Sequence, residues 1–189
     1  MAGCILTEAY SLDCVDKKKA VGGVRAKVWI GNIEELDQTI GDRGFTISVE
    51  GYITAINFTT YGRLYAWSGV KAGNSANDDA QRTAGSGVAF YPHNVLLKVI
   101  DITPEDRKAI ETLANADGVF VIIERAGGVF EIFGRIEGLA LVSAPSDRGA
   151  DTTIDTGRVI TLSGNEPEMA KLILVTDYAT TRALIESYE

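Results

Sequence analysis

The sequence predicts a mainly β fold of the α+β class: a β-sandwich or barrel with one flanking helix and long loops. Three observations support this prediction. Apolar and polar residues alternate in many short runs, which is the period of half-buried strands. Residues 103–116 form one well-capped helical pattern. Residues 101–164 read in order as helix, hairpin, polar loop and strand, and they contain no catalytic residue pattern.

The length and composition favour one domain over residues 1–189. The chain has 189 residues, 46% of them apolar, which is enough for one core. Residues 1–20 read as an N-terminal arm. Residues 71–87 read as an extended loop, because small polar residues dominate there without periodicity. A loop of this length inside a compact domain is often functional.

The strands are predicted from the alternation. Between Val24 and Ile30 every second residue is apolar. Gly51 is expected to mark a bulge inside a long strand. The acidic residues 33–44 are a connection with room for one helical turn. Further strands or segments of β character are expected at residues 45–58, 59–70, 88–91, 95–100, 119–125, 129–141, 159–163 and 171–176.

The helix of residues 103–116 is predicted from its start and its apolar stripe. Thr103 can cap free amides, Pro104 fits the first turn, and the acids that follow favour the positive end of a helix. Ala109, Ile110, Leu113 and Ala114 share one face. A second helix is expected only if residues 180–187 near the C-terminus form one.

A hairpin is predicted to follow the helix, with Ala126-Gly127-Gly128 as the turn between strands 119–125 and 129–141. Glu124, Glu131 and Glu137 alternate with apolar residues there. We therefore expect these three acids on the solvated face of the hairpin rather than as a pair of catalytic carboxylates.

The charge balance argues against tight binding to nucleic acid. The chain carries 26 acidic and 18 basic residues, a net charge of −8, whereas affinity for nucleic acid depends on Lys and Arg contacts to phosphates. A weakly repulsive surface along which DNA slides is compatible with this charge. The apolar runs are far shorter than the roughly 20 residues of a membrane helix, and the N-terminus lacks a signal-peptide pattern. We expect a cytoplasmic site of synthesis.

No catalytic or metal set is evident in the sequence. His93 is the only histidine, and Pro92-His93-Asn94 reads as a turn. No nucleophile elbow is present, so we expect no enzymatic activity and no cofactor. Cys4 and Cys14 are expected to be reduced and to act as apolar fillers or free thiols rather than as zinc ligands.

One polar loop could bind a ligand. Asp147, Asp151 and Asp155 recur every four residues in the loop of residues 143–155, where carboxylates could bind calcium or simply bond local backbone. For Asp78 and Asp79 we expect the second of these, bonds to local backbone.

The aromatic residues around the 71–87 loop could stack on sugars or on a partner protein, or pack beneath the loop. This group comprises Tyr61, Tyr65, Trp67, Phe90 and Tyr91.

Two regions of the chain resemble tail tube and neck-ring proteins of tailed bacteriophages of gut Bacteroidetes, including crAss-like phages. The first is the opening, Cys4-Ile5-Leu6, Leu12-Asp13-Cys14 and Gly22-Gly23-Val24, which leads into Val28-Trp29-Ile30. The second comprises Phe133-Gly134-Arg135-Ile136-Glu137-Gly138-Leu139, then Asp155-Thr156-Gly157, then Ile160-Thr161-Leu162-Ser163-Gly164-Asn165-Glu166-Pro167.

The resemblance implies a tail-tube type of β-sandwich or barrel, made in a host bacterial cytoplasm and located in the virion. It implies self-assembly into rings of six or twelve copies by strand pairing between subunits, contacts with adjacent tail or neck proteins, and DNA only as non-specific cargo in a channel. No membrane partner is expected. The expected assembly residues are Cys4, Leu12, Cys14, Tyr65, Trp67, Asn77, Asp78, Asp79, Asp147, Asp151 and Asp155. The alternative is a β-sandwich module that binds carbohydrate or calcium.

Overall fold

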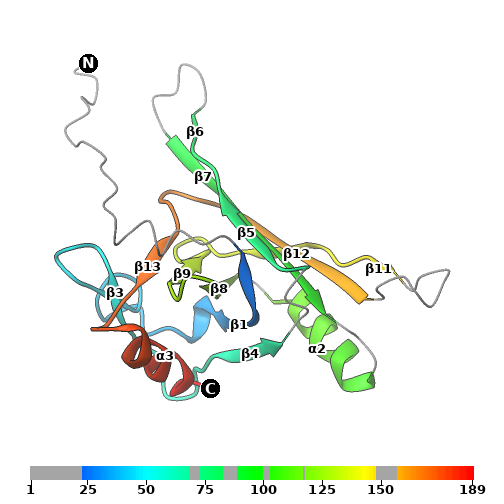
Figure 1. Cartoon of the computed structure of the whole chain (residues 1–189), viewed down its shortest axis with the longest axis horizontal. Helices are drawn as coiled ribbons and strands as arrows, with labels where there is room; N and C mark the ends of the chain where they lie inside the picture. Colours follow the sequence, from blue (N-terminus) through cyan, green and yellow to red (C-terminus); the bar gives the residue numbers. More distant parts are fainter. Residues whose placement is uncertain (1–22, 69–72, 83–88, 100–102, 117, 148–156) are drawn as a thin grey trace.

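The computed structural model describes residues 23–68, 73–82, 89–99, 103–116, 118–147 and 157–189. Over this part of the chain the fold is mainly β, with two sheets and two α-helices (Figure 1). The predicted fold class, mainly β within α+β, is therefore confirmed.

The larger sheet has seven strands in the order β2-β3-β13-β9-β8-β1-β4. Its pairs are antiparallel except for β13 with β3, which is parallel. The strands are β1 (Val24–Asn32), β2 (Phe45–Ile47), β3 (Ile53–Ile56), β4 (Tyr65–Ser68), β8 (Val119–Arg125), β9 (Phe130–Phe133) and β13 (Lys171–Ile173).

The second sheet has the order β10-β12-β7-β5, with β11 paired to β12 and β6 paired to β7. All of its pairs are antiparallel. The strands are β5 (Ser75–Asp78), β6 (Gln81–Arg82), β7 (Ala89–Val99), β10 (Ala140–Ser143), β11 (Ser146–Asp147) and β12 (Gly157–Glu166).

One apolar core lies between the two sheets. Alternate residues of β7 and β12, such as Val95, Leu97 and Ile160, pack in one cluster with Val121 and Ile123 of β8. The helix α2 (Pro104–Ala114) adds Ile110 and Leu113 to the same cluster. The two sheets are thus held face to face, in the manner of a sandwich, with α2 against one end.

A second apolar core covers the opposite face of the seven-stranded sheet. It joins Trp29 of β1, Phe120 and Ile122 of β8, and Phe45 of β2 with Ile185 of the C-terminal helix α3 (Tyr178–Glu186). Consequently the interior strand β8 is buried on both faces from Val119 to Glu124. This explains why its sequence reads as a continuous apolar run rather than as an alternation.

The predicted helix start is confirmed in detail. The side chain of Thr103 accepts a hydrogen bond from the backbone N–H of Asp106, and the Asp106 carboxylate accepts one from the backbone N–H of Thr103. This is a reciprocal capping box. The helix α3 also forms, capped by Asp177, so the described chain has two α-helices rather than one.

The prediction of one strand with a bulge over residues 45–58 was wrong. The segment forms two paired strands, β2 and β3, joined by a turn at residues 48–52. The N–H of Ser48 bonds the carbonyl of Tyr52, and Gly51 has a φ of +89°. The alternation occupies odd positions up to Val49 and even positions from Tyr52, and this change of phase at Gly51 fits a bulge as well as a reversal. In residues 59–70, only β4 forms a strand among the described residues.

The extended loop predicted for residues 71–87 was also wrong in part. Its described part contains β5 and β6, which pair with β7 on the same side. Their small polar residues gave no strand signal because pairing with a long neighbour, rather than side-chain burial, holds them in place.

Residues 89–99 form one continuous strand, and the predicted turn at Pro92-His93-Asn94 does not exist. Pro92 lies opposite Asn165, and His93 lies opposite Gly164. The proline gave a false turn signal.

The second strand of the predicted hairpin ends sooner than expected. β9 stops at Phe133, and residues 134–139 form a turn region with a positive φ at Gly134 and Gly138. Glu124 and Glu131 are 1% and 6% exposed, so their assignment to a solvated face was wrong, whereas Glu137 is exposed. Both faces of this hairpin are covered, and alternation therefore does not mark a wet side.

We predict that replacing Phe120 with Ala will destabilise the protein by about 3–5 kcal/mol, because the ring is fully buried and contacts Phe45 edge-on. The measurement is the free energy of unfolding from urea denaturation. The matched control is Tyr61→Ala: the Tyr61 side chain is 90% exposed, and a change within about 0.5 kcal/mol is expected. Equal effects of the two variants would contradict the second core.

Candidate functional site

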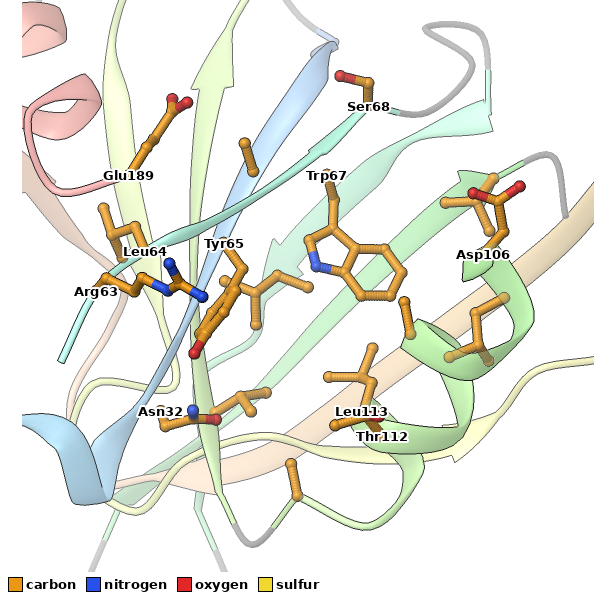
Figure 2. Close-up of a pocket in the computed structure, with 17 residues that line it drawn as sticks. Asn32, Arg63, Leu64, Tyr65, Trp67, Ser68, Asp106, Thr112, Leu113 and Glu189 are labelled. Carbon is orange, nitrogen blue, oxygen red and sulfur yellow. The ribbon is translucent and has the colours of Figure 1, made fainter. Parts of the chain in front are cut away.

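A groove lies between the edge strand β4 and the helix α2. Its volume is about 680 Å³. Figure 2 shows the Trp67 ring between β4 and α2, on the same side of β4 as Tyr65. The apolar lining residues are Ile30, Leu64, Val99, Ala109, Ile110, Leu113, Ala116 and Val119.

The structure brings two of the predicted aromatic residues to this groove. Trp67 is half-buried and packs against the core between the sheets. Tyr65 is 39% exposed, and the Arg63 guanidinium lies 5.1 Å from the centre of its ring. Tyr61 does not line the groove, and Phe90 and Tyr91 belong to the other sheet. The five aromatics therefore do not form a single stacking platform.

The predicted acidic residues are dispersed. Asn77 and Asp79 are exposed, whereas the Asp78 carboxylate turns inward and accepts a hydrogen bond from the N–H of Ala170 (3.0 Å). Asp147 lies on β11, with its backbone opposite Gly157. The other predicted assembly residues, Cys4, Leu12, Cys14, Asp151 and Asp155, lie outside the described residues.

Within the described ranges, no group of three or more His, Cys, Asp or Glu side chains could hold a metal ion. Over the same ranges, no helix is both long enough and apolar enough to cross a membrane.

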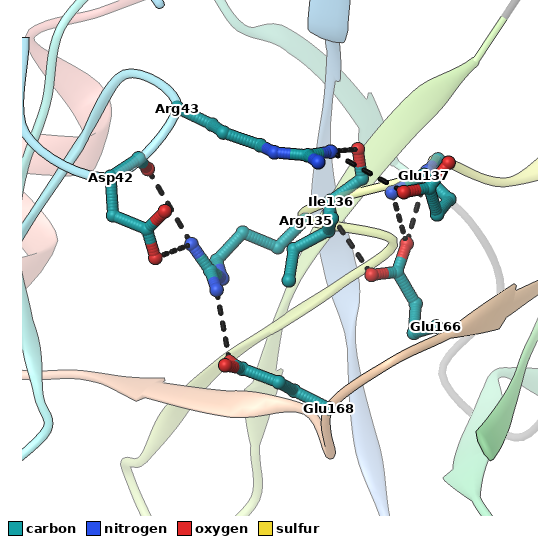
Figure 3. Close-up of polar contacts among 8 residues, drawn as sticks. Asp42, Arg43, Arg135, Ile136, Glu137, Glu166 and Glu168 are labelled. Atoms are coloured by element: carbon teal, nitrogen blue, oxygen red, sulfur yellow. Dashed lines mark hydrogen bonds and ion pairs between the residues drawn. The ribbon is translucent and has the colours of Figure 1, made fainter. Parts of the chain in front are cut away.

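The strongest polar cluster is a junction where β12 meets the turn after β9. The Glu166 carboxylate is 2% exposed and accepts three backbone N–H groups, from Ile136, Glu137 and Gly138, each at 3.0 Å (Figure 3). Hydrogen bonds from consecutive backbone N–H groups to a carboxylate are charge-assisted and therefore stronger than those between neutral groups. This contact fastens the six-stranded sheet to the seven-stranded sheet.

Arg135 extends the same junction. Its guanidinium is almost fully buried and bonds Asp42 at 2.7 Å and Glu168 at 2.9 Å. Glu168 also pairs with Lys171 at 3.0 Å. Burial alone would raise the pKa of Glu168, but the hydrogen bonds from Lys171 and Arg135 outweigh it and lower that pKa. These ion pairs therefore hold Arg135, in the turn after β9, against Asp42 and Glu168.

His93 lies beside this junction and not on a surface turn. It is 2% exposed, its Nδ1 atom accepts the N–H of Gly134 at 3.1 Å, and its ring lies edge-on to Phe133. The buried Nε2 atom has no hydrogen-bond partner among the described residues. Burial lowers the pKa of His93, and the Glu166 and Asp78 carboxylates oppose that shift. The imidazole is therefore held neutral as a hydrogen-bond acceptor.

The sequence contained one signal for this buried histidine. His93 continues the alternation of Val95, Leu97 and Val99, all of which face the core. The carboxylate of Glu166 had no comparable signal, because its partners are backbone groups about 30 positions away in sequence.

Comparison with known proteins gives no family assignment: no family model, no curated protein and no solved structure matches the chain.

We predict that Glu166→Gln will destabilise the protein by about 2–3 kcal/mol, because an amide presents one acceptor oxygen and an N–H₂ group where three N–H donors need a carboxylate. Chemical denaturation measures this change. Glu137→Gln is the matched control, since that side chain is 61% exposed and its pair with Arg43 spans 3.4 Å. A Glu166→Gln variant as stable as the wild type would show that these hydrogen bonds do not stabilise the junction.

We predict that stability falls as the pH drops below about 6.5, the ordinary pKa of histidine. Because the pKa of His93 is lowered in the folded state, the unfolded chain binds the proton more readily below that pH. The contribution of neutral His93 to the free energy of unfolding is fully present above pH 6.5. It is lost as the pH falls toward the pKa of His93 in the folded state. NMR titration of the only imidazole, combined with denaturation at each pH, measures both quantities. In His93→Asn this part of the pH dependence should vanish; an unshifted imidazole in the wild type would refute the assignment.

Proposed function

We propose that the protein is a virion structural protein of a phage tail or neck, which assembles into rings or a tube around a channel for the genome. The observation that carries this proposal is the geometry of the strands. β7 and β12 are the longest strands, and their ends carry the short strands β6 and β11 away from the cores (Figure 1).

The burial of these strands supports a role in contacts with other molecules. β6 is exposed at both residues, and β7 begins with exposed or half-buried residues before its alternation of buried side chains starts at His93. Extended strand pairs outside a core add little to the stability of their own domain. They are well placed to contact a neighbouring subunit.

The sheet edges provide a second line of support. In the described structure the seven-stranded sheet ends at β2 and β4, and the principal path of the other sheet ends at β10 and β5. Open edges invite pairing with strands of another chain. Pairing between copies, in rings of six or twelve, would cover such edges in the assembly.

The proposed cargo is DNA that passes without specific binding. The net charge of −8 disfavours tight contacts with phosphates. Such weak contact is what a channel for DNA would need. The partners would then be further copies of the chain and adjacent tail or neck proteins, in a virion assembled inside a host bacterium.

Negative-stain electron microscopy of the purified protein, across a concentration series, tests this proposal. We expect rings or short tubes with a central channel, and class averages would give the number of copies. The same series is repeated with preformed tail or neck assemblies as templates. Uniform small particles at every concentration, with no incorporation into the templates, would overturn the proposal.

A second candidate function is a module that binds carbohydrate. The specific observation in its favour is the pair Tyr65 and Trp67 beside one groove, since aromatic faces stack on sugar rings. Calorimetry against a glycan panel, with Trp67→Ala as the variant, would detect such binding. A calcium titration in the same experiment addresses the calcium alternative, which would depend on Asp147, Asp151 and Asp155.

A further inference from the structure

The strand β4 is an open edge without the usual protection. In the described structure it pairs only with β1 and ends the seven-stranded sheet. Its four residues, Tyr-Ala-Trp-Ser, carry no charge, and all are exposed or half-buried. Natural sheets normally protect such edges with charged residues, prolines, bulges or a covering segment. An uncharged aromatic edge indicates that another segment covers it.

The groove beside β4 has the shape and lining for the side chains of an added strand. Trp67 forms one wall, and α2 forms the other through Ala109, Ile110 and Leu113 (Figure 2). A strand added to a sheet edge gains main-chain hydrogen bonds along the edge, and it places alternate side chains in pockets beside it. This groove would receive the side chains on one face of such a strand.

The chain has a matching segment before β1. In residues 10–14 the apolar Tyr10, Leu12 and Cys14 alternate with the polar Ser11 and Asp13. This is the period of a strand with one apolar face. Residues 15–22 separate it from the described structure and can span about 26 Å when extended. The segment thus has both the pattern and the reach to contact a neighbouring molecule.

The entry of the chain into β1 favours a second copy over the same molecule. The carbonyl of Gly23 accepts the N–H of Ala126 at 2.9 Å, and Val24 pairs with Arg125 at the end of β8. Gly23 and Val24, the first described residues, therefore bond on the β8 side of β1, whereas β4 lies on the other side. The start of β1 is thus paired with β8 rather than placed beside the free edge of β4, and this favours the β4 edge of another copy.

We propose that residues 10–14 of a second copy pair with the open edge of β4, with Tyr10, Leu12 and Cys14 in the groove against Trp67 and α2. This inference rests on the proposed function and identifies the strands that join its subunits. The segment and the groove are different surfaces, so the contact is head-to-tail, and repetition closes a ring or extends a chain. One such contact is small, and ring closure strengthens it through effective concentration.

Disulfide trapping tests the contact directly. In a Cys4→Ser background, the native Cys14 remains the only natural thiol, and Ala109→Cys places a second thiol in the groove. Mild oxidation should give a ladder of covalent dimers and higher species on a non-reducing gel. The matched control is Ala114→Cys, an exposed position of α2 that does not line the groove, where no ladder is expected.

A pair of charge variants tests the same contact without oxidation. Leu12→Glu should weaken self-association by at least about tenfold in sedimentation analysis, because it places a charge where an apolar side chain is buried. Ser11→Glu adds the same charge on the opposite face of the strand and should leave association within about twofold of the wild type. Comparison of the unfolding transitions of the two variants controls for any effect on the fold.

The outcomes separate this inference from the proposed function. In the Ala109→Cys variant, an intramolecular disulfide between Cys14 and the introduced thiol would show that the segment covers its own β4, and it would overturn pairing between copies. Absence of any cross-link, together with equal behaviour of Leu12→Glu and Ser11→Glu, would overturn the contact altogether. If Leu12→Glu still forms normal rings by electron microscopy, this inference fails and the proposed function stands. A wild type that forms no assembly under any condition contradicts both.

Discussion

The structure depends on one constraint: the seven-stranded sheet must be covered on both faces. Its interior strand β8 is buried from Val119 to Glu124, so the sheet is stable only between two apolar layers. The six-stranded sheet and α2 form one layer. The helix α3 lies on the other face through Ile185, in a cluster that the sheet's own strands β2 and β3 join through Phe45 and Ile53. The burial of apolar area, at about 25 cal/mol per Å², makes this three-layer arrangement the main source of stability.

The polar junction at Glu166 decides how the layers meet. Close-packed apolar side chains leave some freedom of sliding, whereas a buried carboxylate with three amide donors fixes its partners in position. Arg135 and His93 extend the constraint to the turn after β9 and to β7. Glu166, Arg135 and His93 are themselves buried, and each makes a hydrogen bond to another part of the protein.

The edges of the sheets are left for other molecules once the interior is closed. The uncharged β4, the strand β6 and the exposed start of β7 lie at the margins of the two cores, and the proposed assembly would use them. The groove beside β4 connects the sheet edge with the interior, because its floor belongs to the core between the sheets. An added strand would therefore extend an existing core rather than create a new one.

The sequence by itself determined the mainly β class, the start of α2 at Thr103 and the strands that alternate or run apolar, because caps and periodicity act over a few residues. It also indicated Tyr65 and Trp67, although not the groove beside them. Only the tertiary structure decided that residues 89–99 are one strand, that small polar residues of the 71–87 segment form β5 and β6, and that Glu131 and His93 are buried. Each of these outcomes depends on partners distant in sequence. Burial raises the pKa of Glu131 although Arg125, six positions away, pairs with it, and no local pattern encodes that burial.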